Sequence, residues 1–166
     1  MGDAKMIGEW LMALEATTVA GALRHSVWAY PLVNAAHILG VALLVGAVLP
    51  LDLRLLGVWR SVPLAPLWRV LPPTAGVGLG LAMVCGMLLF ITRATEYAAS
   101  GLFITKMLVV SIGLANAVAL RAFVPRTAGP MRPALGKLPI RVQLAGGISL
   151  AAWLTALILG RLVGYF

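Results

Sequence analysis

Four long apolar segments dominate the pattern of hydrophobic and polar positions along the chain. They cover residues 31–51, 70–92, 102–124 and 142–160. Each is close to or above the ~20 residues that a helix needs to cross ~30 Å of hydrocarbon. The pattern therefore predicts four membrane-spanning helices, one of which carries the charged residue Lys106 near its start.

The segment before the first apolar run follows a different pattern. Apolar residues recur at helical spacing and acidic residues interrupt them (Ile7, Trp10, Leu11 and Leu14; Glu9 and Glu15). This spacing predicts an amphipathic helix over residues 5–27 that lies on the outer membrane surface. The acidic residues, with no basic stretch before a compact apolar core, argue against a cleavable signal peptide.

Composition assigns the whole chain to the membrane class. The sequence is 61% hydrophobic and 11% charged, whereas soluble domains are about half apolar and about a quarter charged. We expect one membrane domain over residues 1–166: an all-α integral membrane four-helix bundle with an N-terminal amphipathic helix. The lipid bilayer is then its principal contact.

The positive charges predict the orientation of the bundle. They concentrate in the first and third connections (Arg54, Arg60 and Arg69; Arg121, Arg126, Arg132, Lys137 and Arg141). The positive-inside rule places both connections in the cytoplasm. We therefore expect a multi-pass protein of the bacterial inner membrane with both termini in the periplasm. The net charge of +8 then reports topology, and no nucleic-acid partner is expected.

The first span holds an imidazole where hydrocarbon is expected. His37 follows Pro31 by six residues, which places it ~9 Å below the outer start of the helix. Asn34 shares its helix face and could orient the ring, and Gly40 could clear space beside it for a flat macrocycle. Ionisable groups inside a membrane are costly, so a ligand role for His37 is one hypothesis. A hydrogen bond to another helix, or proton handling, are the others.

Other candidate groups are predicted at a similar depth. Lys106 follows the outer start of the third span, and Met87 lies near the outer end of the second, before Arg93 and Glu96. We predict that His37, Met87 and Lys106 share one layer of the outer leaflet. Lys106 and Arg93 are the candidate partners for haem propionates. Glu96 is another candidate anionic partner for Lys106, and the structural alternative is that the Lys106 side chain extends to the outer interface.

Several remaining features predict contacts within the bundle. Gly76 and Gly80 form a GxxxG step, which favours a close helix contact. Asn116 is expected to hydrogen-bond a neighbouring helix. Asp52 and Arg54 are expected to form an ion pair where the first span ends.

The sequence contains no recognisable catalytic set. It shows no nucleophile with a base, no phosphate loop, no paired carboxylates and no zinc-ligand spacing. With two histidines and one cysteine, a metal cluster built from this chain alone is not expected. We therefore expect no stand-alone enzyme. The lone His37 and the GxxxG step make a homodimer, or a larger membrane complex, an attractive hypothesis.

Two stretches carry a family resemblance. "HILGVALLVGAVLPLDLRLLG" resembles the first helix of a superfamily of small four-helix bacterial membrane proteins, and "LFITKMLVVSIGLANAVALRAFVP" resembles a later helix. The superfamily includes the copper-resistance D-type proteins and the HemJ-type protoporphyrinogen oxidases. The nearest similarity is to an uncharacterised family with a "YP…HILG…DLRLLG" pattern.

The resemblance implies roles for three residues. It matches His37 to the histidine of helix one, Arg54 to its exit arginine and Lys106 to the later lysine. In the HemJ-type proteins the equivalent histidine is implicated in binding b-type haem. This chain has no histidine after the Lys106 helix and lacks the larger copper-type bundle. Those departures argue against protoporphyrinogen oxidase activity and against copper import.

The leading functional hypothesis is a haem-b-binding membrane protein that handles electrons or haem near the periplasmic face. Its cofactor-binding residues would be His37, Asn34, Gly40, Lys106 and Arg93, with His37 and Met87 as candidate metal ligands. The second axial position would belong to Met87, to His37 of a second copy, or to no residue. A copper-handling or transport protein that uses Met83, Met87, His37 and Cys85 is the alternative. A structural or assembly subunit without a cofactor is the third.

Overall fold

The computed structural model describes residues 2–123 and 138–165, and every regular element in these ranges is a helix. Four of the helices are long and apolar enough to cross a membrane. The predicted all-α membrane bundle is thus confirmed for the described part of the chain. The helices are α1 (Gly2–Glu15), α2 (Thr18–His25), α3 (Ala29–Leu55), α4 (Leu64–Phe90), α5 (Ala94–Ala99), α6 (Gly101–Phe123) and α7 (Ile140–Leu162).

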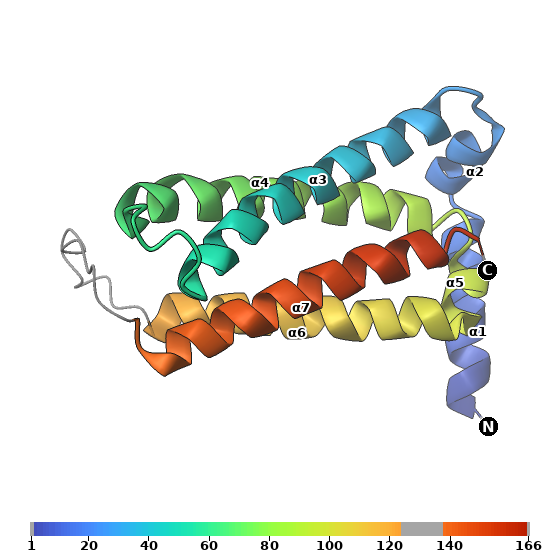
Figure 1. The fold of residues 1–166 in the computed structure, drawn as a ribbon. Helices are drawn as coiled ribbons and strands as arrows, with labels where there is room; N and C mark the ends of the chain where they lie inside the picture. Colours follow the sequence, from blue (N-terminus) through green and yellow to red (C-terminus); the bar gives the residue numbers. More distant parts are fainter. Residues whose placement is uncertain (1, 124–137, 166) are drawn as a thin grey trace.

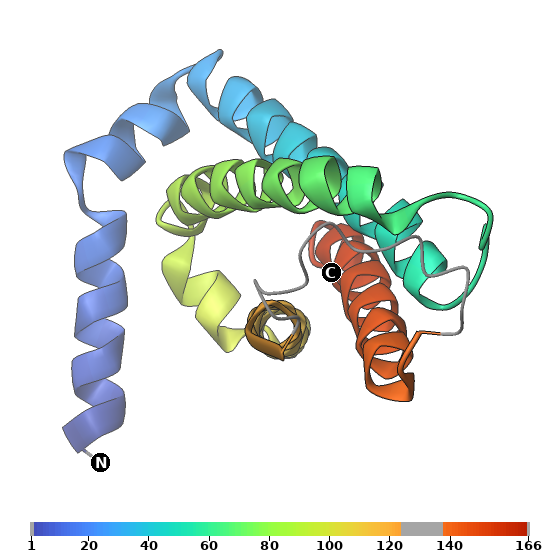
Figure 2. The ribbon, with the colours of Figure 1, turned by 90° about the vertical axis from the view of Figure 1, so that its left-hand side faces the viewer.

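The four long helices form two antiparallel hairpins, α3 with α4 and α6 with α7 (Figure 1). Contact between α3 and α7 joins the hairpins (Figure 2). The described residues of α4 and α6 make no comparable contact with each other. We call the bundle end at residues 56–63 the inner end and the end at α5 the outer end.

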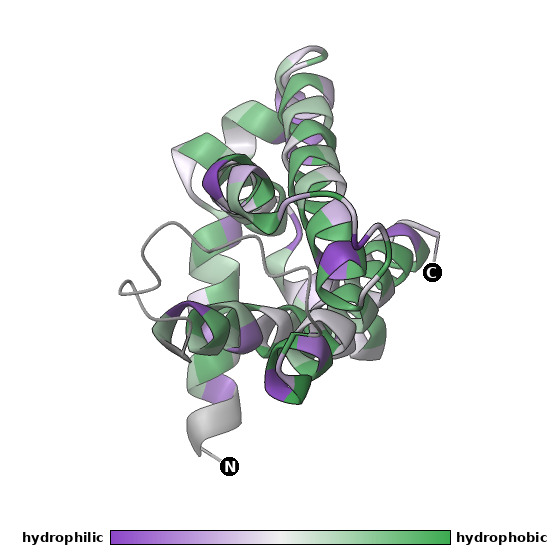
Figure 3. Cartoon of the chain, turned by 60° about the vertical axis from the view of Figure 1, so that its left-hand side comes forward, coloured by the Kyte–Doolittle hydropathy of each residue, from purple (hydrophilic) through white to green (hydrophobic). Residues whose placement is uncertain are grey.

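Most of the surface of the long helices is not covered by protein. At most 22% of the apolar window of any of the four is buried. Hydrophobic residues run along their outer faces (Figure 3). Exposing such a surface to water costs ~25 cal/mol per Å², whereas acyl chains accept it at no such cost. The chain is therefore a multi-pass membrane protein whose outer faces suit contact with lipid.

The N-terminal segment forms two helices, which corrects the prediction of one helix over residues 5–27. Thr17 is the reason for the break. Its hydroxyl donates to the Leu14 carbonyl at 2.7 Å and accepts from the Ala20 N–H at 3.3 Å, so it caps α2 just after α1 ends. α1 crosses the outer end of the bundle with Trp10 exposed (Figure 1).

Two glycines bring α3 and α4 into backbone contact. A Cβ on Gly40 would lie 2.6 Å from the Ala82 nitrogen, and one on Gly78 would lie 2.6 Å from the Leu44 nitrogen. Helices in lipid gain stability from such close packing. The step at Gly76 and Gly80, by contrast, faces outward, with nothing within 4 Å of either position. Among the described residues, the close contact predicted for Gly76 and Gly80 is therefore not made by them. Gly40 and Gly78 make such a contact instead.

The inner end has a small apolar core between the hairpins. Leu51, Leu55 and Leu64 are buried there, and Leu120 and Val142 pack against them. This contact explains why α3 runs past the predicted end of its span at residue 51 and why α4 begins before residue 70. Burial of these apolar side chains stabilises the extra turns of helix.

Polar contacts at the inner half match one prediction and correct another. Asn116 of α6 donates to the Ala145 carbonyl of α7 at 2.9 Å, as predicted. Arg54 donates instead to loop carbonyls, from Nε to Val62 at 2.7 Å and from Nη2 to Arg60 at 3.2 Å. The predicted Asp52–Arg54 ion pair is therefore wrong, because the guanidinium turns toward the 56–63 connection while Asp52 faces α7.

The glycine contact gives a matched test of packing. In Gly78→Ala, the added methyl must displace the α3 backbone, and overpacking of this kind costs about 1–3 kcal/mol. We expect a lower unfolding temperature in detergent for this variant. Gly46→Ala, on α3, is the control and should be unchanged, because its new methyl enters open space. Equal unfolding temperatures for the two variants would contradict the close contact.

Candidate functional site

His37 is held against the backbone of α4. Its Nδ1 lies 2.8 Å from the Ala82 carbonyl oxygen. Because a carbonyl only accepts, Nδ1 must carry the proton, and Nε2 then keeps its lone pair. Gly86 makes room for the ring, since a Cβ there would lie 3.1 Å from Cε1. The imidazole is half-buried, and its Nε2 has no hydrogen-bond partner among the described residues.

The two residues predicted to assist His37 from its own helix do not contact the ring. Asn34 is exposed, and no hydrogen bond between its amide and the imidazole is present in the described part of the structure. Gly40 is buried in the α3–α4 crossing, where the Ala82 and Gly78 backbones occupy the space beside it. Gly40 therefore positions α4 against α3, and the room beside the ring comes from Gly86.

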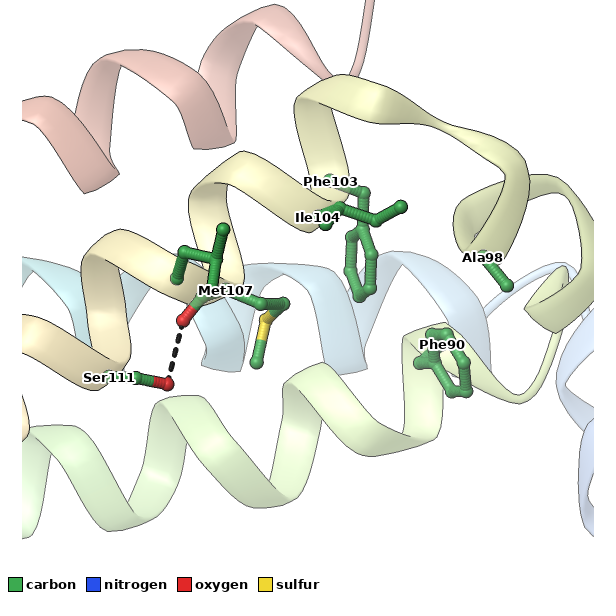
Figure 4. Close-up of a pocket in the computed structure, with 7 residues that line it drawn as sticks. Phe90, Ala98, Phe103, Ile104, Met107 and Ser111 are labelled. Carbon is green, nitrogen blue, oxygen red and sulfur yellow. Dashed lines mark hydrogen bonds between the residues drawn. The ribbon is translucent and has the colours of Figure 1, made fainter.

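An apolar pocket opens between the hairpins one turn outward from Gly86. It has a volume of about 330 Å³ and is lined by α4, α5 and α6 (Figure 4). The Ser111 hydroxyl in its wall donates to the Met107 carbonyl at 2.9 Å, so it offers no free proton to a ligand. The lining residues are Phe90, Ala98, Phe103, Ile104, Met107, Leu108 and Ser111.

Aromatic rings form the outer wall of this pocket. Phe90 and Phe103 stack with ring centroids 5.5 Å apart, and Tyr97 lies 5.3 Å from Phe103. Such pairs add about 0.5–1.5 kcal/mol beyond the area they bury. The cluster joins α4, α5 and α6 at the outer end. It links α4 to α6, which otherwise make little direct contact in the described residues. Burial raises the pKa of the Tyr97 phenol, which therefore stays neutral.

Lys106 extends from α6 into the same region. Its ammonium lies 4.8 Å from the centroid of the Phe103 ring, and its stem passes Gly160 of α7. The side chain is half-buried. A cation over an aromatic face is stabilised by the ring quadrupole. The structure thus places Lys106 between Phe103 and α7 and places His37 against α4, and neither is among the residues that line the pocket.

The sulfur-containing residues that the sequence suggested as metal ligands do not gather at one place. Met87 is 63% exposed and Met83 is 59% exposed, whereas Cys85, between them in sequence, is buried. Residues two apart on a helix point in nearly opposite directions, so these three sulfur atoms do not form one ligand set. No cluster of three or more His, Cys, Asp or Glu residues exists in residues 2–123 and 138–165.

Arg93 is exposed at the outer end. It forms an ion pair with Glu96 at 3.4 Å, and Glu96 is therefore not the partner of Lys106. Exposed ion pairs of this kind contribute little to stability. Arg93 remains a candidate for contact with an anion at the membrane surface.

A polar clamp that the sequence did not reveal secures the N-terminal helices. The Glu15 carboxylate accepts from both the N–H and the hydroxyl of Thr95, each at 2.7 Å. Arg24 donates to the Glu15 carbonyl at 2.7 Å and to the Thr92 carbonyl at 3.1 Å. The partners are up to 80 residues apart in the chain, so no local motif could have indicated them. This clamp fixes α1 and α2 on the outer end.

Comparison of the chain with protein-family models, curated proteins and solved structures gives no match.

The clamp predicts a pH dependence at the outer end. The two hydrogen bonds from Thr95 lower the pKa of Glu15 from its ordinary 4.5. A lowered pKa means that the stabilisation is fully present above pH 4.5 and is lost as the pH falls through the lower value. The Thr95 amide resonance in detergent micelles should titrate with a midpoint below 4.5.

Two variants control this titration. In Glu15→Gln the titration should disappear, because the titrating carboxyl is gone. Glu9→Gln should leave it intact, since Glu9 is an exposed acid on the same helix. A Thr95 resonance that titrates alike in Glu15→Gln and the parent protein would contradict the clamp.

Proposed function

We propose that this chain is a bacterial inner-membrane protein that binds haem b near its periplasmic face, in electron transfer or haem handling. His37 would hold its iron. The observation that carries the proposal is the hydrogen bond from Nδ1 to the Ala82 carbonyl. Metal-ligating histidines commonly donate their other ring N–H to such a group, which fixes the tautomer and orients the ring.

The surrounding residues fit a flat, apolar group with an anionic edge. The pocket one turn outward from Gly86 is lined by aromatic and aliphatic side chains, and Lys106, half-buried with its ammonium over Phe103, is a cation that could pair with a propionate. When bound, haem supplies one-electron chemistry, while the protein sets its position and surroundings. His37 would hold the iron, and Phe90 and Phe103 would exclude water.

We propose that His37 alone of this chain's residues would hold the iron, and that the chain assembles with a second copy of itself. Met87 points outward in its own chain, so it does not face His37. Gly76 and Gly80 form a smooth outer face on α4 with nothing against it in the described residues. This face suits close approach of another helix. A homodimer packed there is our proposal for the assembly.

One observation also favours a cofactor-free structural subunit. The His37–Ala82 bond joins α3 to α4 and would lock the hairpin even without a ligand. In that case the imidazole contributes about 1 kcal/mol of interhelical hydrogen bonding. The copper alternative has less support, because Met83, Met87 and Cys85 do not converge with His37.

The absorption spectrum of the purified protein tests the haem proposal. The parent protein should show a Soret band, and His37→Gln should lose most of it. Glutamine can still donate to the Ala82 carbonyl but has no imidazole nitrogen for iron, so the hairpin should persist. His25→Ala is the control and should keep the band, because His25 lies exposed at the end of α2.

Three other results would overturn the proposal, each in favour of a different function or ligand. Colourless protein that retains stoichiometric copper would favour copper handling. Colourless, metal-free protein that co-purifies with a partner would favour the structural subunit. A full Soret band in His37→Gln would show that haem is held by another residue.

Orientation can be tested with single cysteines. We propose that the inner end faces the cytoplasm, because Arg60 of the 56–63 connection and the exposed Arg121 and Arg141 at the helix ends lie there. In a Cys85→Ala background, Val27→Cys should react with a membrane-impermeant maleimide in spheroplasts, since residue 27 is 80% exposed at the outer end. Ser61→Cys should react only after the membrane is permeabilised. The reverse pattern would invert the topology.

A further inference from the structure

A carboxyl group is buried where the two hairpins meet. Asp52 lies in the last turn of α3 and is 3% exposed. Across from it, α7 presents Gly146 and the buried Ser149. A Cβ on Gly146 would lie 3.3 Å from the Asp52 carbonyl oxygen. The absence of a side chain at Gly146 is therefore what lets α7 cover this part of α3.

The Asp52 side chain lacks partners for a negative charge. Among the residues that the structure describes, its Oδ2 has no hydrogen-bond partner, and the neighbouring polar group is the neutral Ser149 hydroxyl. No ion pair reaches it within residues 2–123 and 138–165. Arg54, two residues later, is bonded to loop carbonyls.

The neighbouring helices do not supply a cation either. The side chains of Arg69 on α4, Arg121 on α6 and Arg141 on α7 are all exposed. The α4 residues that pack against this end of α3 are apolar, among them Leu64 and Leu67. In the described part of the chain, the groups around Asp52 are thus apolar side chains, backbone and one hydroxyl.

We infer that Asp52 is a proton-binding site: its carboxyl is held as the neutral acid in the folded protein. An isolated carboxylate in an apolar interior pays a desolvation cost of several kcal/mol, which a cation must offset. No described cation does so here, and taking up a proton removes the charge. The neutral acid can donate as well as accept, so it can bond to Ser149 across the α3–α7 contact.

The location gives this proton a structural consequence. The α3–α7 contact is the extensive one between the hairpins in the described part of the chain. Loss of the proton would leave a bare carboxylate inside that contact and weaken it. The inference does not depend on haem binding, because Asp52 lies at the inner end and His37 in the outer half.

Infrared spectroscopy tests the inference on the full-length protein in lipid. At pH 6, an aspartate in water, with a pKa of about 3.9, is about 1% protonated. We expect a protonated-carboxyl C=O band at pH 6, equivalent to about one group per chain, which shifts in deuterated buffer. The chain has only five acidic side chains, so the assignment is tractable. The band should vanish in Asp52→Asn and persist in Glu15→Gln.

Isotope labelling keeps the test decisive if the Asn variant does not fold. Asp3 and Asp52 are the only aspartates, so a ¹³C label in the aspartate carboxyl should move the band of the parent protein. Absence of the band at pH 6, or a band that neither Asp52→Asn nor the label changes, would overturn the inference. Haem binding would be unaffected by either result.

Discussion

Backbone contact between α3 and α4 at Gly40 and Gly78 is the constraint on which the rest of the structure depends. Lipid gives no hydrophobic reason for two apolar helices to associate, so close packing must hold them together. The crossing brings α4 close enough for the Ala82 carbonyl to accept a hydrogen bond from His37. The close contact at Gly40 leaves no room for a macrocycle there. By bringing Ala82 next to His37, this contact also orients the imidazole.

The two ends of the bundle are held together by different interactions. At the outer end, three aromatic rings and the Glu15–Thr95 clamp join α1, α4, α5 and α6, and the pocket lies beneath them. At the inner end, an apolar core and the Asp52–Ser149 neighbourhood join α3 to α7. A group bound in the outer half and a proton held at the inner end would therefore both affect how the two hairpins pack against each other.

The candidate site was only partly predictable. His37 and Lys106 stood out as candidates because a charge or imidazole is conspicuous in an apolar run. Asn34 and Gly40 were assigned to the site by helical spacing and Met87 by depth, and the structure places these three on an exposed face or in a helix contact. Spacing along one helix says which residues share a face, and it does not say what that face meets. The aromatic wall and Gly86 come from other helices and had no local signal.

The sequence by itself determined the class of protein and the four spans, because the length and polarity of a segment decide whether it can reside in hydrocarbon. Only the tertiary structure decided which glycines touch, that Asp52 is buried without Arg54, and that Glu15 meets Thr95. The physical reason is that lipid and protein interior are both apolar. Hydropathy therefore cannot tell the faces of a spanning helix apart, and only packing can.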